Sequence, residues 1–324
     1  MHTPFNAHKS ETGKAVFAFH PNAVDDPNLR NALQTAEFIA DAIHAPLMAA
    51  TMVDSSDPIL HLKFQTRLGV SIDTRFLTDQ NRGEESDVQS FLDNKELKSA
   101  KLIVSVTHLP KLIGATVFDH FGAGLIETSS IPILAVRFDS PPMTKVSRLV
   151  FVSDLTPAER PVFTEALGWA KVLGAEVVLT SSSIGPWSVE AQSVDGMTPF
   201  TSESDEEIER QTDDANQVGQ RWSREAIQAG VPAEFRLATS FQTVANNTID
   251  VAEENAANMI VIGRAHYRSL ASSVLFGGPL HDLINLSHLP ILILMNGASN
   301  MSQQHYECVC RKKRVIRILN RASF

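Results

Sequence analysis

The sequence has only two cysteines among its 324 residues, Cys308 and Cys310, which are separated by a single residue. They are too few and too close together to form a disulfide framework, which is consistent with a reducing compartment. No apolar run approaches the ~20 residues that a membrane-spanning helix needs, and residues 1–14 lack the apolar core of a signal peptide. We therefore expect a soluble, cytoplasmic protein without a transmembrane segment.

Basic residues are outnumbered, with 28 Lys and Arg against 37 Asp and Glu and a net charge of −9. A general nucleic-acid binder neutralises phosphates with Lys and Arg, so we expect no nucleic-acid partner. Six of the basic residues lie in residues 301–324 with one acid, Glu307, so this basic C-terminal segment carries +5 and residues 1–300 carry −14. The length and the 43% hydrophobic content are ordinary for about two globular domains.

The common catalytic motifs are missing: G-x4-G-K-[S/T], G-x-G-x-x-G, G-x-S-x-G and H-E-x-x-H do not occur. The sequences after the first expected strand of each half, FHPNAVDDPN and VSDLTPAERP, lack the Gly- and Ser-rich phosphate loop of adenylating α/β enzymes. The acidic run SESDEEIERQTDD (202–214) has no apolar surroundings to raise a carboxyl pKa. It predicts a solvated loop and helix face, with a docking site for a basic partner as the alternative.

Short apolar runs alternate with helical patterns along the chain. Strands are expected at residues 15–19, 46–53, 69–77, 102–106 and 132–136, and again at 148–154, 176–180, 233–239, 259–263 and 290–295. Helical patterns lie between them, among them one over residues 88–100. This alternation predicts an α/β fold with two five-stranded, mostly parallel sheets and helices on both faces.

The second half repeats the order of the first. Pro132 and Pro290 are 158 residues apart, and the same spacing separates Val104 from Ile262 and His108 from His266. His20 and Asp154 are only 134 apart, so about 24 extra residues lie between the second and third strands of the second half. The predicted domains are residues 14–138 and 147–296, joined at Pro141-Pro142 and followed by the basic C-terminal segment.

The most informative segment is residues 259–295. A buried strand ends at Gly263, a loop follows that contains Gly277 and Gly278, and Pro279 opens a helix. Glycine lets the backbone approach a ligand closely, and the free N–H groups of a helix start favour phosphate. On these residues alone, a phosphate site and ordinary turn chemistry are both open.

This arrangement resembles the universal stress protein (UspA-like) family, whose nucleotide-binding members carry G-x2-G-x9-G-[S/T] after the fourth strand and an Asp after the first, here Asp154. Gly263 matches the first glycine of this motif and Gly277 the third. His266 stands in place of the second glycine, and ten residues instead of nine separate it from Gly277. Gly278 stands in place of the Ser or Thr. The resemblance covers residues 14–137 and 147–296. It implies tandem Rossmann-like (adenine nucleotide alpha hydrolase-like) domains that pair through their fifth strands as an internal pseudo-dimer.

In the first half the corresponding positions hold other residues. His20 replaces the Asp, and the motif positions carry Ser105, His108, Asp119 and His120. Because an Asp repels phosphate, we expect the first domain to have lost nucleotide binding. At the strand ends of the first half we expect three histidines to gather, His20, His108 and His120. Three interpretations are open: solvated loop residues, a contact for an anion or nucleotide, or ligands of a metal ion.

The resemblance implies a stress-response binding and regulatory protein without dedicated catalysis. ATP or another adenine nucleotide, with Mg²⁺, would bind the second domain: Asp154 faces the adenosine, Gly263 permits close approach, Gly277 and Gly278 cradle phosphates, and His266 adds a contact or blocks the site. The alternatives are a nucleotide-free adaptor that dimerises and docks a regulatory protein, and a weak ATPase or autophosphorylating protein.

The basic C-terminal segment also admits more than one interpretation. Val315, Ile316 and Leu319 could share one helical face and Arg314, Arg317 and Arg321 another, as in a contact with an anionic membrane or an acidic partner. The alternative is an extension that docks on the acidic body or is unrelated to the fold. His305, Cys308 and Cys310 are too few ligands in too short a segment to predict a metal site.

Overall fold

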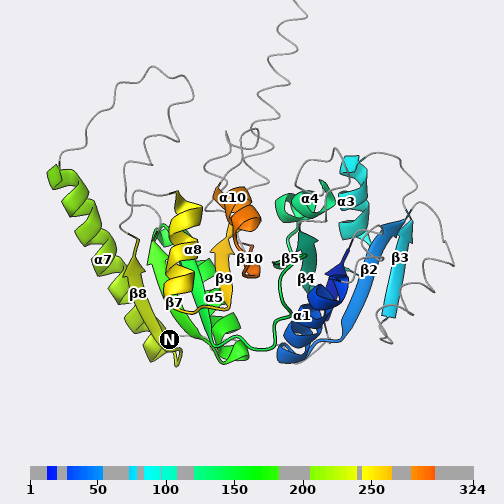
Figure 1. Ribbon diagram of the computed structural model, residues 1–324, viewed down its shortest axis with the longest axis horizontal. Helices are drawn as coiled ribbons and strands as arrows, with labels where there is room; N and C mark the ends of the chain where they lie inside the picture. Colours follow the sequence, from blue (N-terminus) through cyan, green and yellow to red (C-terminus); the bar gives the residue numbers. More distant parts are fainter. Residues whose placement is uncertain are drawn as a thin grey trace, which may run out of the picture.

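The computed structural model describes residues 13–19, 28–53, 73–78, 84–95, 97–107, 120–181, 205–238, 243–264 and 279–295 (Figure 1). Its strands form one ten-stranded sheet in the order β3-β2-β1-β4-β5-β10-β9-β6-β7-β8. The first five strands in the sequence form one side of this sheet and the last five the other, and we call these the first and second halves. Within each half every strand pairing is parallel. The predicted α/β class is therefore confirmed.

The first half contains β1 (Lys14–Ala18), α1 (Leu29–Ala42), β2 (Leu47–Val53), β3 (Asp73–Thr78), α3 (Glu84–Asp93), β4 (Ala100–Thr107), α4 (His120–Thr128) and β5 (Ile133–Arg137). Each predicted strand is present to within a few residues. The helix predicted over 88–100 is wrong beyond Asp93. The chain turns there because Leu97 has to enter the core, where it is fully buried, before β4 begins.

The second half contains β6 (Arg148–Ser153), the short 3-10 helix η2 (Pro157–Glu159), α5 (Arg160–Leu173), β7 (Glu176–Ser181), α7 (Asp205–Gln228), β8 (Ala233–Leu237), α8 (Val244–Glu254), β9 (Met259–Gly263), α10 (Pro279–Leu286) and β10 (Ile291–Leu294). As predicted, α5 ends at Gly174, which has a φ of 65°. Pro279 is the first residue of α10, also as predicted.

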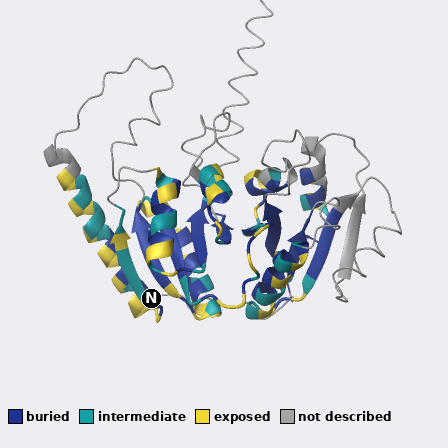
Figure 2. Ribbon diagram, viewed as in Figure 1, coloured by how far each residue is buried: buried dark blue, intermediate teal, exposed yellow. Residues whose placement is uncertain are grey.

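Two apolar cores lie on the two faces of the sheet. Helices α1, α5 and α7 cover one core, and α3, α4, α8 and α10 cover the other. Figure 2 shows the strands buried between helices whose outer faces are exposed. Each core contains residues of both halves, for example Leu134 and Phe138 together with Val162 on the α1 and α5 face. The halves are therefore parts of one continuous interior.

The two halves meet where β5 pairs with β10, the only antiparallel pairing among the described strands. Leu134 lies opposite Leu292, and these two residues are 158 positions apart. Equivalent residues of the two halves thus face each other, which places a pseudo-two-fold axis at this pair. The prediction that the two fifth strands pair within one chain is confirmed.

Detailed contacts repeat across this axis. The Ser129 hydroxyl accepts the N–H of Ile131 at 2.9 Å, and the Ser287 hydroxyl accepts the N–H of Leu289 at 3.0 Å. Both pairs of residues are related by the offset of 158. The ends of α1 and α5 are related by a smaller offset of 130: the N–H of Ala45 donates to the carbonyl of Ala40, as Ala175 donates to Ala170.

The strand register corrects the predicted equivalence of β4 and β9 by one residue. Phe17 pairs with Val104 and its counterpart Phe151 pairs with Val261, an offset of 157 instead of 158. The predicted match of Val104 with Ile262 is therefore wrong. Because side chains alternate between the faces of a sheet, a slip of one residue exchanges the faces. The counterpart of Gly263 is Val106, which shares its face, and not Ser105.

The segment between β7 and β8, in which the predicted insertion lies, contains α7, whose 24 residues span about 36 Å. Its C-terminal part packs on β8, where Gly219 lies so close to Phe235 that a Cβ would come within 2.4 Å of the ring. From residue 209 to 218 no residue of α7 is buried, and Figure 1 shows this end of the helix projecting past the sheet. The predicted solvated helix face is thus confirmed for Glu209, Asp213 and Asp214.

Candidate functional site

The strand order of the second half reverses between β6 and β9. From β6 the chain continues to β7 on one side, and β9 lies on the other side. In open α/β sheets ligands bind beside the carboxyl ends of the strands at such a switch point. Asp154 follows the last residue of β6, and Gly263 is the last residue of β9. The pairing of Val152 with Ile262 places these two predicted site residues on neighbouring strand ends.

Asp154 lies in a tight turn between β6 and η2. The Ser153 hydroxyl accepts the N–H of Leu155 at 3.0 Å, and Asp154 Oδ1 accepts the N–H of Thr156 at 2.9 Å. Leu155 has a φ of 60°, an uncommon conformation for a branched side chain. The Asp154 carboxylate is thereby held at the strand end with one oxygen in the turn, and its side chain is partly exposed.

Gly263 is required by packing within the second half. A Cβ on this residue would lie 2.9 Å from Oε2 of Glu159 and 3.1 Å from Cγ1 of Val162. Glu159 ends η2 and is only 2% exposed, so its carboxyl group lies inside the protein directly beside the end of β9. Glu159 was not among the residues predicted for the site. A comparison of the halves at the offset of 130 would have found it, because its counterpart is the apolar Leu29.

The first half fills the corresponding place with hydrocarbon. Leu29 stands at the position of Glu159, Ala32 at that of Val162, and Val106 at that of Gly263. All three are buried. At these corresponding positions, only the second half therefore has a glycine packed against a buried carboxyl group.

Several predicted site residues lie outside the described part of the chain. These are His266, Gly277 and Gly278 of the second half, and His20, His108 and Asp119 of the first. His120 begins α4, but its side chain is among those not described. Within the described ranges, no three or more His, Cys, Asp or Glu side chains are placed to hold a metal ion. The basic C-terminal segment also lies outside these ranges.

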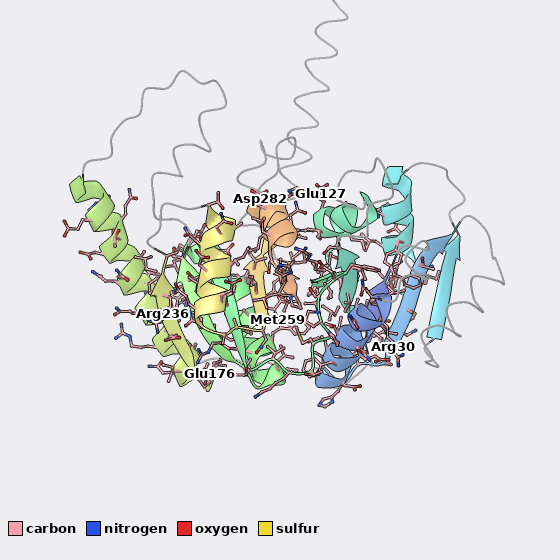
Figure 3. All side chains as sticks on the ribbon, viewed as in Figure 1. Arg30, Glu127, Glu176, Arg236, Met259 and Asp282 are labelled. Atoms are coloured by element: carbon pink, nitrogen blue, oxygen red, sulfur yellow. The ribbon has the colours of Figure 1, made fainter. Side chains whose placement is uncertain are left out.

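An arginine next to the site reaches across to the first half. Arg264 follows Gly263, and its guanidinium donates to the carbonyls of Ile126, Glu127 and Ser129 at the end of α4. Figure 3 labels Glu127 on α4, close in this view to Asp282 on α10. A cation at a helix C-terminus is favoured by the helix dipole. Nothing in the sequence pattern indicated this contact, because it depends on the pairing of the halves.

A second arginine makes a comparable contact in the opposite direction. Arg137 at the end of β5 donates to the carbonyl of Asn285 near the end of α10 at 3.1 Å. Glu127 and Asn285 are 158 residues apart, so each half presents an equivalent carbonyl to an arginine of the other half. The arginines are not themselves equivalent, because Arg264 follows β9 whereas Arg137 is the last residue of β5.

Helix α5, which begins beside the site, is anchored on α7. Arg160 makes two hydrogen bonds to the Glu225 carboxylate, at 2.5 and 2.9 Å, and lies over the ring of Trp222 at 4.8 Å. The bonds from Arg160 hold the pKa of Glu225 below its usual value. Helix α7 therefore supports the segment that carries Glu159.

The fold and the switch point define a doubly wound α/β protein with its candidate site in the second half. The model of the universal stress protein family matches residues 145–294. The matched segment carries all five predicted site residues, so residues 145–294 are similar to a universal stress protein domain. No curated protein significantly matches the chain.

Solved structures extend the likeness of fold to both halves. A putative universal stress protein from Pseudomonas aeruginosa UCBPP-PA14 is 13% identical with a TM-score of 0.54, covering 87% of this chain and 93% of its own. A universal stress protein from Archaeoglobus fulgidus DSM 4304 is 13% identical with a TM-score of 0.53, covering 88% and 97%. A functionally unknown protein from Pseudomonas aeruginosa PAO1 is 11% identical with a TM-score of 0.54, covering 88% and 93%. At these identities the likeness establishes the fold alone.

Among the described residues, no helix combines the length and the apolar character that crossing a membrane requires.

Proposed function

We propose that this protein is a regulatory binding protein of the universal stress type that binds an adenine nucleotide, ATP, in its second half. The observation that supports this proposal most directly is the position of Asp154 and Gly263. Both lie at the ends of neighbouring strands at the switch point, inside the segment that matches the family.

The described residues fit the adenosine part of such a ligand. The partly exposed Asp154 carboxylate can accept a hydrogen bond from a ribose hydroxyl or the adenine amino group. The side of Gly263 that would carry a Cβ is filled by Glu159 and Val162, so the ligand has to approach this residue along its backbone.

The phosphates belong at the other end of the site. Gly277 and Gly278 immediately precede α10, and the start of a helix favours anions through its free N–H groups. Pro279 offers no N–H, so donors have to come from the residues around it. Mg²⁺ bound to the phosphates would offset their repulsion by Asp154.

Among the residues of the first half that the structure describes there is no such place, since Leu29 and Val106 fill the positions of Glu159 and Gly263. One nucleotide per chain is therefore the expected stoichiometry. We assign no catalytic step to the site, so the bound ATP should be recovered intact. A nucleotide-free adaptor and a weak ATPase are the outcomes that would replace this proposal.

Calorimetric titration with ATP and Mg²⁺ tests the proposal. The protein should bind one equivalent, and Asp154→Asn should weaken binding roughly tenfold, because a hydrogen bond to a charged group contributes about 1.5–3 kcal/mol. The asparagine retains an oxygen for the turn with Thr156. Asp213→Asn on the exposed face of α7 is the matched control and should bind as the parent does. If the parent protein does not bind ATP, the nucleotide-free adaptor replaces this proposal. If the parent protein releases phosphate from ATP and Asp154→Asn does not, the protein is an ATPase.

A further inference from the structure

The segment that follows β5 lies on helix α1. The N–H of Met143 donates to the Thr35 hydroxyl at 3.0 Å, and Thr35 is fully buried. Phe138 and Met143 belong to the same core cluster as Ile39, which is 1% exposed. Residues 138–146 thus cover one side of α1 on their way to β6.

Helix α5 carries the corresponding positions in the second half. The offset of 130 that relates the ends of the two helices places Glu165 at the position of Thr35 and Trp169 at that of Ile39. Trp169 makes a side-chain hydrogen bond to the Glu165 carboxylate, and burial raises the pKa of that group. Both side chains remain partly exposed, however, whereas Thr35 and Ile39 are buried.

The chain leaves β10 at a position related by the pseudo-two-fold axis to its exit from β5. Leu134 and Leu292 lie on this axis, and α5 packs on β10 as α1 packs on β5. The offset of 158 places residues 296–304 at the positions of 138–146, and Met301 at that of Met143. The segment 296–304, NGASNMSQQ, contains no charged residue, so it can lie against a partly apolar helix face without burying a charge.

We propose that residues 296–304 dock on α5 over Glu165 and Trp169, in the way that residues 138–146 dock on α1. The Glu165 carboxyl group accepts a backbone N–H of the segment in place of the Thr35 hydroxyl, and Met301 packs on the Trp169 ring. The basic residues from Arg311 onward are thereby held near a body whose residues 1–300 carry a net charge of −14. This inference is independent of nucleotide binding.

Fluorine NMR of protein labelled with 5-fluorotryptophan tests the proposal. The chain has three tryptophans, so three resonances are expected, and Trp169→Phe assigns the one of interest. In a chain that ends at Met295, the Trp169 resonance should shift and its solvent isotope effect should increase. The resonance of Trp222, which is 2% exposed, should stay unchanged. An unchanged Trp169 resonance would overturn the proposal.

Substitutions in the full-length chain provide the second test. Met301→Ala should reproduce much of the Trp169 shift, whereas Ser302→Ala in the same segment should not. Glu165→Gln, which retains an acceptor oxygen, should preserve the docked position, and Glu165→Leu should release it. If the Trp169 resonance instead responds to removal of residues 1–12 and not to Met301→Ala, the N-terminal segment covers α5 and the proposal is wrong.

Discussion

The buried carboxyl group of Glu159 occupies the space into which a side chain at Gly263 would extend, with Oε2 2.9 Å from the position of a Cβ. The glycine at the end of β9 is therefore fixed by the packing of η2 and α5 against the strand. Any ligand at the switch point meets a rigid strand end whose α5 side is already filled. This relationship separates the second half from the first, where the corresponding residues, Leu29 and Val106, are aliphatic and buried.

Gly263→Ala should destabilise the protein by about 1–3 kcal/mol, the usual cost of overpacking a core. Glu159→Ala in the same chain should recover part of that loss, since the oxygen nearest to the new methyl group is removed. Denaturant unfolding of the two single variants and the double variant measures this coupling.

Gly174→Ala is the matched control for this cycle. It also costs stability, because Gly174 has a φ of 65°, but no atom lies within 4 Å of its Cβ position. Its effect should simply add to that of Glu159→Ala. Additive effects at Gly263 as well would contradict the packing explanation.

Arg264→Gln should lower the free energy of unfolding by about 1.5–3 kcal/mol, the range for hydrogen bonds to a charged group. It removes the donors to the carbonyls of Ile126, Glu127 and Ser129. Arg137→Gln loses one carbonyl contact to the other half, at Asn285, and an ion pair with the exposed Asp139. It should cost less, because exposed ion pairs contribute little to stability. If denaturant unfolding gives the same loss of unfolding free energy for both variants, the contacts of Arg264 with α4 do not contribute to stability.

The bond between Arg160 and Glu225 predicts a pH dependence of stability. Because the pKa of Glu225 is lowered in the folded protein, its contribution is present above its unfolded pKa and is lost as pH falls through the folded value. The parent protein should therefore lose more stability between about pH 5 and pH 3 than Glu225→Gln does. The difference should be modest and should shrink in salt, since both side chains are more than a third exposed.

Arg160→Gln supplies the complementary measurement for this pair. It removes the cause of the lowered pKa, so its profile of unfolding free energy against pH should match that of Glu225→Gln. A profile as steep as that of the parent protein in either variant would show that other carboxyl groups dominate the acid response.

Leu134→Ala and Leu292→Ala should each cost about 2–5 kcal/mol, as expected for fully buried leucines. The two losses should be similar, because the residues face each other across the pseudo-two-fold axis. Both variants should still unfold in a single transition, since each core joins the two halves. Val172→Ala, at a residue 52% exposed, should have little effect. Separate transitions for the two halves would contradict the common core.

Much of this fold could be predicted from the sequence because its signals are local. The apolar runs locate the ten strands, and the repeat at 158 residues brings the segments of β5 and β10 together. The predicted offset between β4 and β9 was wrong by one residue, because both strands are continuous apolar runs. Such runs do not show which residue faces which side. Only the hydrogen-bond register distinguishes Val106 from Ser105 as the counterpart of Gly263.

The contacts that shape the site could not be predicted in the same way. Glu159 lies in the polar sequence TPAERP, where a carboxylate suggests solvent, and it is buried only because η2 folds onto the end of β9. Arg264 contacts α4 only because the two halves pair. Asp154 and Gly263 were predicted as site residues, and the structure adds that each also has a local structural role.

The measurement that tests the central claim most directly is mass spectrometry of the nucleotide released when the purified protein is denatured. We predict close to one intact ATP per chain, reduced in Asp154→Asn and in Gly277→Asp and unchanged in Asp213→Asn. Absence of any nucleotide, together with no thermal shift when ATP and Mg²⁺ are added, would contradict the claim that the second half is a nucleotide site.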